Sequence, residues 1–484
     1  MSQIEELEFR TKKLESLREL GINPYPSVTK RTHTCHECVV RFDEFVESNQ
    51  TVSLCGRLRL MRKHGGSIFL TIEDETSQFQ LYVKKDNVSQ NEFTLTSELL
   101  DIGDFVQAEG TVFRTRLGEK TLHVHSISLL TKTLLPLPEK WHGLSDVETR
   151  YRKRYLDLIT NPSVRDIFCK RSLLIKEIRS FFEERGFMEV ETPILQAIPG
   201  GAMARPFVTH HNTLDQDMYL RIAPELHLKR LIVGGFEKVF EIGKNFRNEG
   251  IDHSHNPEFT ELEAYMAYAD YTILENLIEE LIVRLLVKVP TDTLHVTVPF
   301  PRIPYLSALQ HATGISQTTL RDETDLRTEC IKRGVQKEVT ISHSVLLDYL
   351  TKTHVLPTMS APTFLVDHPV ALSPLSKRKS DDNALVERFQ LIIEGKEIVN
   401  AFSELNDPCD QAERFTEQEK NRSKGDQETH PKDDEFIEAL RHGLPPTAGL
   451  GIGIDRLIAL FVGAHNLKEV ILFPTLRDVN SVSE

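Results

Sequence analysis

The chain has 484 residues, of which 39% are hydrophobic and 27% are charged, and its formal net charge at pH 7 is −14. This length allows two or more domains with substantial cores, and the composition is ordinary for a soluble globular protein. No apolar run approaches the roughly 20 residues that span a bilayer, and the first residues lack the basic start and apolar core of a signal peptide. With six cysteines that form no recognisable disulfide framework, the sequence predicts a cytoplasmic protein without a membrane segment.

Residues 1–50 are predicted to form an N-terminal helical segment, with a helix over 2–20 that ends before Gly21-Ile22-Asn23-Pro24. The pattern His33-x-Cys35-His36-x-Cys38 has zinc-ligand residue types, but no second ligand pair follows at a finger-like spacing. We interpret it as incidental.

Residues 51–133 have the pattern of an all-β domain. Short strand-like segments at 52–60, 67–73, 78–83, 105–113 and 121–129 are separated by turns. Such a series suits an OB-type barrel, a common module for single-stranded nucleic acids. The net charge argues against a nucleic-acid binder, but basic residues cluster at 57–64 and 150–154, and an acidic protein can bind RNA along a local basic stripe.

Residues 134–150 are predicted to be a linker, and residues 151–484 a second, larger domain. A long amphipathic helix is expected over 162–185, followed by a strand at 187–193. Helices and strands then alternate irregularly, which predicts an α+β domain with a mixed, largely antiparallel sheet flanked by helices. The polar segment 417–435 is expected to lie on the surface.

A hairpin rich in functional side chains is predicted around residues 240–266. Phe240, Ile242 and Phe246 share one strand parity, while Arg247 and Glu249 take the other. A strand with one face in solvent would show the same alternation of apolar and polar residues. That interpretation explains poorly the intervening loop, which is dense in Asn, Asp, His and Glu.

Glycines stand at alternate positions of a later strand, Gly449-Leu450-Gly451-Ile452-Gly453, which leads into a helix with Arg456 at the junction. Removing the side chains from one strand face allows a flat ligand or a backbone to approach closely. Alone this pattern is weak, but with the hairpin it indicates a ligand site.

At these residues the sequence resembles the class II aminoacyl-tRNA synthetases. The hairpin is similar to their motif 2, the Gly-Arg segment to motif 3, and the helix and strand at 162–193 to motif 1, which in this family builds a homodimer interface. Along nearly the whole chain, the sequence is most similar to that of the lysyl-tRNA synthetases. The segments that carry this likeness are Pro199-Gly200-Gly201-Ala202-Met203, Arg221-Ile222-Ala223-Pro224-Glu225, Phe246-Arg247-Asn248-Glu249-Gly250-Ile251-Asp252-His253, His255-Asn256-Pro257-Glu258-Phe259-Thr260 and Asn400-Ala401-Phe402-Ser403-Glu404.

The resemblance implies that lysine is activated by ATP and then passed to the terminal ribose of tRNA(Lys). Arg247 would bridge the lysine carboxylate and the α-phosphate through its fork of donors, although a lone Arg on a strand is usually a surface ion pair. Phe259 and Arg456 would sandwich the adenine ring. The residues implied for catalysis are Arg247, Glu249 and Arg456, and those for ATP add His255, Asn256, Phe259 and Glu397.

The resemblance also implies a lysine pocket made of carboxylates and aromatic rings. Glu404 and Tyr265 would receive the ε-ammonium group, Phe402 would line the stem, and Asn400 would place the carboxylate. Glu225 and the backbone near Gly201 would hold the α-amino group. Any one of these acidic residues alone would more often be a salt-bridged surface Glu. The remaining members of the implied set are Glu263, Gly451 and Gly453.

The magnesium site departs from the family pattern. Related enzymes carry a Glu seven residues before the position of Glu397, where this chain has Gln390. If Glu394-Gly395 forms a two-residue turn, Gln390 lies diagonally on the same face as Glu397. Mg²⁺ prefers carboxylates but also accepts an amide carbonyl. The resemblance therefore implies Mg²⁺ on Glu397, with Glu394 as an alternative source of the second carboxylate.

In the β domain, Phe69 and Gln80 fall where the family stacks and reads an anticodon base, and Arg62 is a further candidate. An exposed Phe supplies a face for an unstacked base, although Phe69 could equally fill the barrel core.

Two other functions remain open at this point. A ligase that lysylates a protein would resemble the catalytic half but lack the β domain. A catalytically silent paralogue is favoured by Gln390 and opposed by the presence of Arg247, Glu397 and Arg456.

Overall fold

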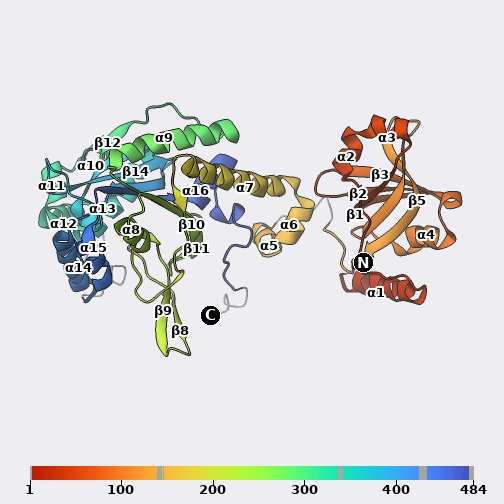
Figure 1. Cartoon of the computed structure of the whole chain (residues 1–484), viewed down its shortest axis with the longest axis horizontal. Helices are drawn as coiled ribbons and strands as arrows, with labels where there is room; N and C mark the ends of the chain where they lie inside the picture. Colours follow the sequence, from red (N-terminus) through yellow and green to blue (C-terminus); the bar gives the residue numbers. More distant parts are fainter. Residues whose placement is uncertain (1–2, 139–143, 145, 336–341, 424–432, 479–484) are drawn as a thin grey trace. The chain divides into compact units, whose positions relative to one another are not determined.

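A computed structural model describes residues 3–138, 144, 146–335, 342–423 and 433–478 (Figure 1). The chain divides into two compact units, Met1–Ser145 and Asp146–Glu484. Part of the expected linker, residues 139–143 and 145, lies outside the described residues, as do residues 424–432 of the polar segment. The first residues of that segment belong to helix α14 (Pro408–Ser423).

The first unit contains a closed barrel of strand order β1-β2-β3-β5-β4. Side chains alternate between the core and the outside along each strand, so that Ile68, Leu70 and Ile72 of β2 are buried. The OB-type barrel expected from the sequence is confirmed. Its strands are β1 (Thr51–His64), β2 (Ser67–Glu73), β3 (Gln78–Lys84), β4 (Phe105–Arg114) and β5 (Lys120–Thr131).

Short helices pack around this barrel: α1 (Gln3–Glu19), α2 (Cys35–Val40), α3 (Phe42–Ser48), η1 (Lys85–Asn87), α4 (Gln90–Thr94) and η2 (Leu95–Leu99). Cys35 and Cys38 are fully buried in the barrel core with Phe42 and Phe45. Burial raises the pKa of each thiol to about 12, so neither forms the thiolate that binds zinc. The cysteine pattern is thus explained by packing.

The second unit is built on a mixed sheet of strand order β12-β13-β14-β15-β16-β11-β10-β6. Only the pairs β12–β13 and β10–β6 are parallel among those of this sheet that the structure describes, which confirms the predicted largely antiparallel sheet. The strands are β6 (Met188–Glu189), β10 (Lys238–Phe246), β11 (Glu258–Ala267), β12 (Arg302–Pro304), β13 (Thr363–Pro369), β14 (Leu385–Ile393), β15 (Lys396–Ser403) and β16 (Thr447–Gly453).

Helices α7 (Pro162–Glu183), α9 (Tyr271–Lys288) and α16 (Ile454–Val462) cover one face of this sheet (Figure 1). Their apolar sides form one core with strand residues such as Phe240, Leu262 and Phe389. Helix α8 (Glu225–Val233) packs near the opposite face, against β10, β11 and α15 (Asp434–Gly443). The sheet face beside α8 is therefore left partly open, and it is the face that carries the site.

The remaining elements surround the sheet edges. They are α5 (Val147–Arg152), α6 (Arg154–Thr160), α10 (Tyr305–Thr313), α11 (Gln317–Arg321), α12 (Glu323–Lys332), α13 (His343–Leu350), η3 (Thr351–Val355), η4 (Leu356–Thr358), η5 (Val370–Leu372) and η6 (Leu467–Glu469). A separate sheet of order β7-β9-β8 forms a projecting hairpin from β7 (Leu195–Gln196), β8 (Val208–His211) and β9 (Gln216–Leu220) (Figure 1). Within the described part of the chain, no helix has both the length and the apolar character needed to cross a membrane.

Candidate active site

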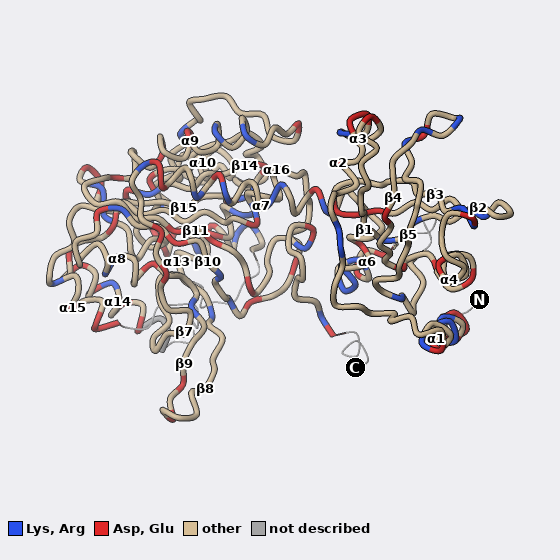
Figure 2. Tube along the Cα trace, turned by 45° about the vertical axis from the view of Figure 1, so that its right-hand side comes forward, with Lys and Arg blue, Asp and Glu red and all other residues tan. Residues whose placement is uncertain are grey.

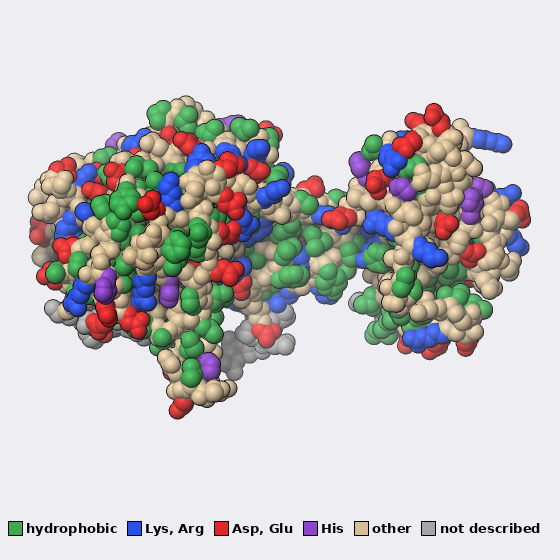
Figure 3. All heavy atoms as spheres, viewed as in Figure 1, with side chains coloured by type: hydrophobic (Ala, Val, Ile, Leu, Met, Phe, Trp, Pro, Cys, Tyr) green, Lys and Arg blue, Asp and Glu red, His purple; other side chains and the backbone are tan. Residues whose placement is uncertain are grey.

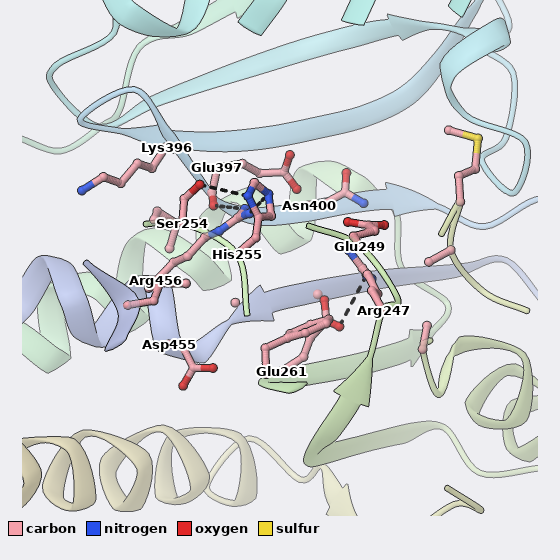
Figure 4. Close-up of a pocket in the computed structure, with 18 of the residues that line it drawn as sticks. Arg247, Glu249, Ser254, His255, Glu261, Lys396, Glu397, Asn400, Asp455 and Arg456 are labelled. Atoms are coloured by element: carbon pink, nitrogen blue, oxygen red, sulfur yellow. Dashed lines mark hydrogen bonds and ion pairs between the residues drawn. The ribbon is translucent and has the colours of Figure 1, made fainter. Parts of the chain in front are cut away.

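The open face of the large sheet holds a cavity of about 1010 Å³. Its floor consists of β11, β16 and β15, and its rim includes the loop between β10 and β11 (Figure 4). Acidic residues follow one another along β11 (Figure 2), and two of them, Glu261 and Glu263, line the cavity. The predicted parity of the hairpin is thus realised as an apolar face on the core and a charged face on the cavity.

Strand register explains why glycines alternate in β16. Glu261 pairs with Gly453, Glu263 with Gly451, and Tyr265 with Gly449. Each large side chain of β11 on the cavity face therefore stands beside a residue that has none. This pairing keeps the floor of the cavity open between the acidic side chains.

Gly449 has the least room of these glycines. A Cβ at this position would collide with Oε1 of Glu404 and with the ring of Tyr265. At Gly453 the nearest atom would be Cδ of Arg456 at 3.7 Å, which is an ordinary contact. Gly449 was absent from the residues predicted for lysine, although the alternation of the strand points to it as much as to Gly451.

Arg247 lies at the end of β10 and points towards Glu261, with 4.0 Å between Nη2 and Oε2 (Figure 4). Its guanidinium group stands 4.9 Å from the ring centroid of Phe259. Nε of Arg247 is buried without a hydrogen-bond partner among the described residues. The Arg247 side chain as a whole is 34% exposed and lines the cavity, and a permanent cation there is suited to bind an anionic oxygen.

The loop between β10 and β11 brings the other predicted ATP residues to the cavity. His255 contacts Asp252, with 2.9 Å between Nδ1 and Oδ2, and its Nε2 lies 3.4 Å from Nη2 of Arg456 (Figure 4). Nη1 of Arg456 donates to the carbonyl oxygen of Glu397 over 3.1 Å. Glu249 is exposed on the cavity rim.

Asn256 has a different environment. Its side chain donates to the carbonyl oxygen of Glu258 over 2.6 Å and accepts from the backbone nitrogen of Thr475 over 3.3 Å. Since both amide atoms are engaged in this way, Asn256 holds the shape of the loop beside the cavity.

At the opposite end of the cavity, Glu225, Glu263 and Tyr265 are all buried. The Tyr265 hydroxyl donates to Oε2 of Glu263 over 2.9 Å. Burial, reinforced by the neighbouring carboxylates Glu261 and Glu225, raises the pKa of Glu263 well above its ordinary value. Gly201 reaches this end with φ +90°, and a Cβ there would stand 3.0 Å from those of Ala223 and Glu225.

Glu404 lies behind the cavity wall and does not line the cavity. Its side chain is 0% exposed and forms an ion pair with Nζ of Lys229, whose side chain is 1% exposed. The same Nζ donates to Oε1 of Glu225 over 2.5 Å. Lys229 was not predicted from the sequence, although its position four residues after Glu225 on a helix is the spacing of an ion pair.

Asn400 and Phe402 line the cavity from β15. Oδ1 of Asn400 accepts a hydrogen bond of 2.9 Å from Nε of Arg388 on β14. The Asn400 amide nitrogen is therefore the group left to donate into the cavity. Arg388 was also missed, and the only sequence signal for it is its shared strand parity with Gln390.

The turn at Glu394 and Gly395 has φ angles of 51° and 70° at these residues, and Ile392 pairs with Glu397. Nε2 of Gln390 donates to Oε2 of Glu397 over 2.6 Å, and Oε1 of Gln390 lies 3.1 Å from Nε2 of His368. Burial lowers the pKa of His368 well below its ordinary value, so this ring is neutral and carries a single N–H, and its Nδ1 lies 3.4 Å from the carbonyl oxygen of Arg388. The Gln390 carbonyl thus faces His368, and its amide hydrogens face Glu397.

Carboxylate oxygens on the cavity face are the ligands that Mg²⁺ accepts, and Glu397 supplies one. The described residues contain no ready-made cluster of three or more His, Cys, Asp or Glu side chains for a metal ion. A magnesium ion here would therefore depend on ATP oxygens and water for most of its ligands.

In the barrel, Phe69 is half-buried on the outer surface, between the buried residues Ile68 and Leu70. Arg62 pairs with Phe69 across β1 and β2, and Phe69 pairs with Tyr82 across β2 and β3. Gln80 lies on the same face as Tyr82, two residues away. The three predicted contact residues thus share one surface, and Phe69 does not belong to the barrel core.

Known protein families match both units. Residues 146–477 match the family described as tRNA synthetases class II (D, K and N), and residues 52–130 match the OB-fold nucleic acid binding domain. Together with the sheet, the cavity and the hairpin, these matches show that the chain belongs to the class II aminoacyl-tRNA synthetases.

Individual relatives narrow this assignment. The chain is 47% identical over 477 residues to the lysine–tRNA ligase of Carboxydothermus hydrogenoformans, and the matched residues cover 97% of each chain. It is 48% identical to that of Pelotomaculum thermopropionicum, over 97% of this chain and 94% of the relative. The enzyme of the same name from Helicobacter pylori is 46% identical, over 98% of this chain and 97% of the relative. Within its class, this chain groups with the lysine–tRNA ligases.

Proposed function

We propose that this protein activates L-lysine with ATP and transfers the lysyl group to the terminal ribose of tRNA(Lys). In the first step a lysine carboxylate oxygen attacks the α-phosphorus of ATP, so that lysyl-adenylate forms and pyrophosphate leaves. In the second step a ribose hydroxyl attacks the carbonyl carbon of the adenylate and AMP leaves. The observation that carries the proposal is a cavity with Arg247 at one end and three buried carboxylates, Glu225, Glu263 and Glu404, at or just behind the other.

ATP is proposed to bind at the Arg247 end. The guanidinium fork of Arg247 would hold the α-phosphate next to the lysine carboxylate. This positioning supplies most of the catalysis that phosphoryl chemistry needs from a protein. Glu249 and His255 extend from the loop towards the nucleotide, and Phe259 with Arg456 would flank the adenine. Glu397 would hold Mg²⁺, which neutralises charge on the phosphate oxygens.

Lysine is proposed to bind with its α-amino group at Glu225 and the Gly201 backbone, and its ε-ammonium near Tyr265 and Glu404. Asn400 would donate to the carboxylate from its free amide nitrogen. An ammonium group leaves water only if paired acceptors replace its hydration, and the buried carboxylates provide them. Phe402, Glu263, Gly451 and Gly453 would shape the space between the two ends.

The barrel is proposed to bind the anticodon of tRNA(Lys). A half-exposed Phe69 offers a face on which a base can stack, while Arg62 beside it can attract the backbone and Gln80 can bind a base edge. The presence of this domain argues against a ligase that acts on a protein.

The proposed assembly is a homodimer formed through α7 and the strand that follows it. Around this segment and the projecting hairpin several apolar side chains are exposed, more than isolated surface residues would require. Hydrophobic side chains are visible on and above the hairpin in Figure 3. They include Met188 at 51% exposed, Ile194 at 44%, Leu195 at 45% and Val208 at 60%.

The cytoplasm is the proposed compartment, because the six cysteines all carry free thiols.

The experiment that tests the proposal is ATP–pyrophosphate exchange with each standard amino acid in turn, followed by charging of tRNA(Lys). We expect rapid exchange with lysine alone. Equal exchange with aspartate or asparagine would overturn the proposed substrate, and no exchange with any amino acid would indicate a catalytically silent paralogue.

A further inference from the structure

Lys229 is a buried charged residue to which the proposed reaction gives no role. It lies on α8 and is fully buried, and its ammonium group lies between the carboxylates of Glu225 and Glu404. The rings of Phe402 and Phe436 lie 5.5 and 5.9 Å from the same Nζ. A lysine held in this way has no route to solvent, so its charge acts only on the groups around it.

Those groups belong to the two ends of the proposed lysine pocket. Glu225 lines the cavity where the α-amino group would bind, and Glu404 lies behind the wall where the ε-ammonium would bind. Lys229 therefore connects, through a single ammonium group, the two carboxylates that the substrate needs. The other charged groups facing this cluster are Glu263 on β11 and Arg388 on β14.

Glu404 keeps one oxygen free of this pair. Oε2 contacts Lys229, whereas Oε1 is buried with no hydrogen-bond partner in the described part of the chain. Oε1 lies beside Gly449, and so does the Tyr265 ring; Gly449 and Tyr265 both line the cavity. When Lys229, Glu225 and Glu404 are all ionised they carry one net negative charge, which one further ammonium would neutralise.

We propose that Lys229 is a positioning residue for lysine selection, which holds Glu404 in place and favours its carboxylate form, so that its free oxygen can accept the substrate ε-ammonium. The inference rests on the proposed function. Burial alone lowers the pKa of Lys229, but the charges of Glu225 and Glu404 more than reverse this and raise it. Burial raises the pKa of Glu404 well above its ordinary value, and the charge of Lys229 opposes this rise. Without the Lys229 ammonium the pKa of Glu404 would rise further, and a protonated Glu404 attracts a cation less.

The test is a double-mutant cycle with Lys229→Met and Glu404→Gln, read out as KM for lysine in ATP–pyrophosphate exchange. Lys229→Met alone is expected to raise KM for lysine by roughly a hundredfold, with KM for ATP nearly unchanged. In the Glu404→Gln background the same change should have little further effect, because Lys229 acts through Glu404.

A matched control is Arg230→Met, the next residue of α8, whose guanidinium pairs with Asp433 instead. It should leave KM for lysine unchanged. Lys229→Met should also move the acid limb of the pH profile of lysine KM to higher pH, which a packing defect would not do.

Three results would overturn the proposal: an unchanged KM for lysine in Lys229→Met, a lowered one, which would make Lys229 a competitor of the substrate, or additive effects in the cycle. If Lys229→Met does not fold, the double variant removes both buried charges together. It is then expected to fold and to match Glu404→Gln in lysine KM, and a much higher KM would contradict the proposal. A wild-type protein without lysine-dependent exchange would instead defeat the proposed function.

Discussion

Gln390 donates a hydrogen bond of 2.6 Å to Glu397 across the β14–β15 hairpin, at the position where the family resemblance implies a second carboxylate. The bond confirms that these side chains share a face and shows that the Gln390 amide hydrogens, rather than its carbonyl oxygen, face Glu397. The carbonyl oxygen of Gln390 faces His368 instead. Glu397 is therefore the acidic member of the pair, and its charge is partly engaged by a neutral donor.

We expect Gln390→Glu to lower the Mg²⁺ concentration needed for half-maximal pyrophosphate exchange. A second unit charge at about 4 Å from the ion contributes roughly 4 kcal/mol at an effective dielectric near 20, before desolvation is subtracted. Glu397→Gln should nearly abolish exchange. If Gln390→Glu leaves the Mg²⁺ requirement unchanged while Glu394→Gln raises it, Glu394 supplies the second carboxylate and this account of the site is wrong.

Glu404→Gln is expected to weaken the binding of lysine far more than the binding of ATP. Removing one partner of a buried charge pair costs about 3–5 kcal/mol, which corresponds to a rise in lysine KM of roughly two orders of magnitude or more. Steady-state exchange measured at varied lysine and at varied ATP separates the two affinities. An equal loss of both would identify Glu404 as a purely structural residue.

Gly449→Ala should impair lysine binding because its methyl group would collide with Oε1 of Glu404 and the Tyr265 ring. Overpacking of this kind costs about 1–3 kcal/mol. Gly453→Ala is the matched control, since its methyl group would meet only the Arg456 side chain, at the ordinary contact distance of 3.7 Å. Equal lysine KM values for the two variants, measured in the exchange assay, would contradict the proposed place of the ε-ammonium.

Lysine binding should strengthen as pH rises and should release protons. Burial raises the pKa of Glu404 and, despite the opposing charge of Lys229, that of Glu225. Bound ammonium groups stabilise the carboxylate forms and lower these pKa values in the complex. A group whose pKa falls on binding loses its proton, so affinity increases with pH up to the pKa of the free protein and then levels off.

Calorimetric titration of lysine in buffers of different ionisation enthalpy measures this proton release directly. Glu404→Gln should reduce the number of protons released. Proton uptake on lysine binding would show that binding raises the pKa values of these carboxyl groups, contrary to this prediction.

Phe69→Ala is expected to reduce charging of tRNA(Lys) and to leave pyrophosphate exchange intact. Stacking of a base on an aromatic ring contributes about 1–3 kcal/mol, and Phe69 is half-buried on the outside of the barrel. Phe79→Ala serves as the contrast, because Phe79 is 3% exposed in the barrel core and its loss should lower Tm, by the equivalent of about 3–5 kcal/mol. A similar fall in Tm for Phe69→Ala would mean that the ring mainly stabilises the barrel.

Local periodicity in the sequence determined which side chains share a strand face and which residues lie opposite each other across a turn. The alternation along 67–73 and 78–83 is enough to place Phe69 and Gln80 on one surface once the strands pair. The two-residue turn at Glu394 and Gly395 likewise sets Ile392 opposite Glu397. Such features depend on neighbours in the chain, where the geometry of a strand or turn leaves few alternatives.

The partners of the buried charges were decided only by the tertiary structure. Lys229 reaches Glu404 from a helix that precedes it by well over a hundred residues, and Glu404 lies behind the cavity wall instead of on it. No sequence spacing specifies that contact, because it depends on how α8 and the end of β15 pack on the same sheet. A buried ion pair is stable only when its members and their surroundings meet in one geometry, and that geometry exists only in the folded chain.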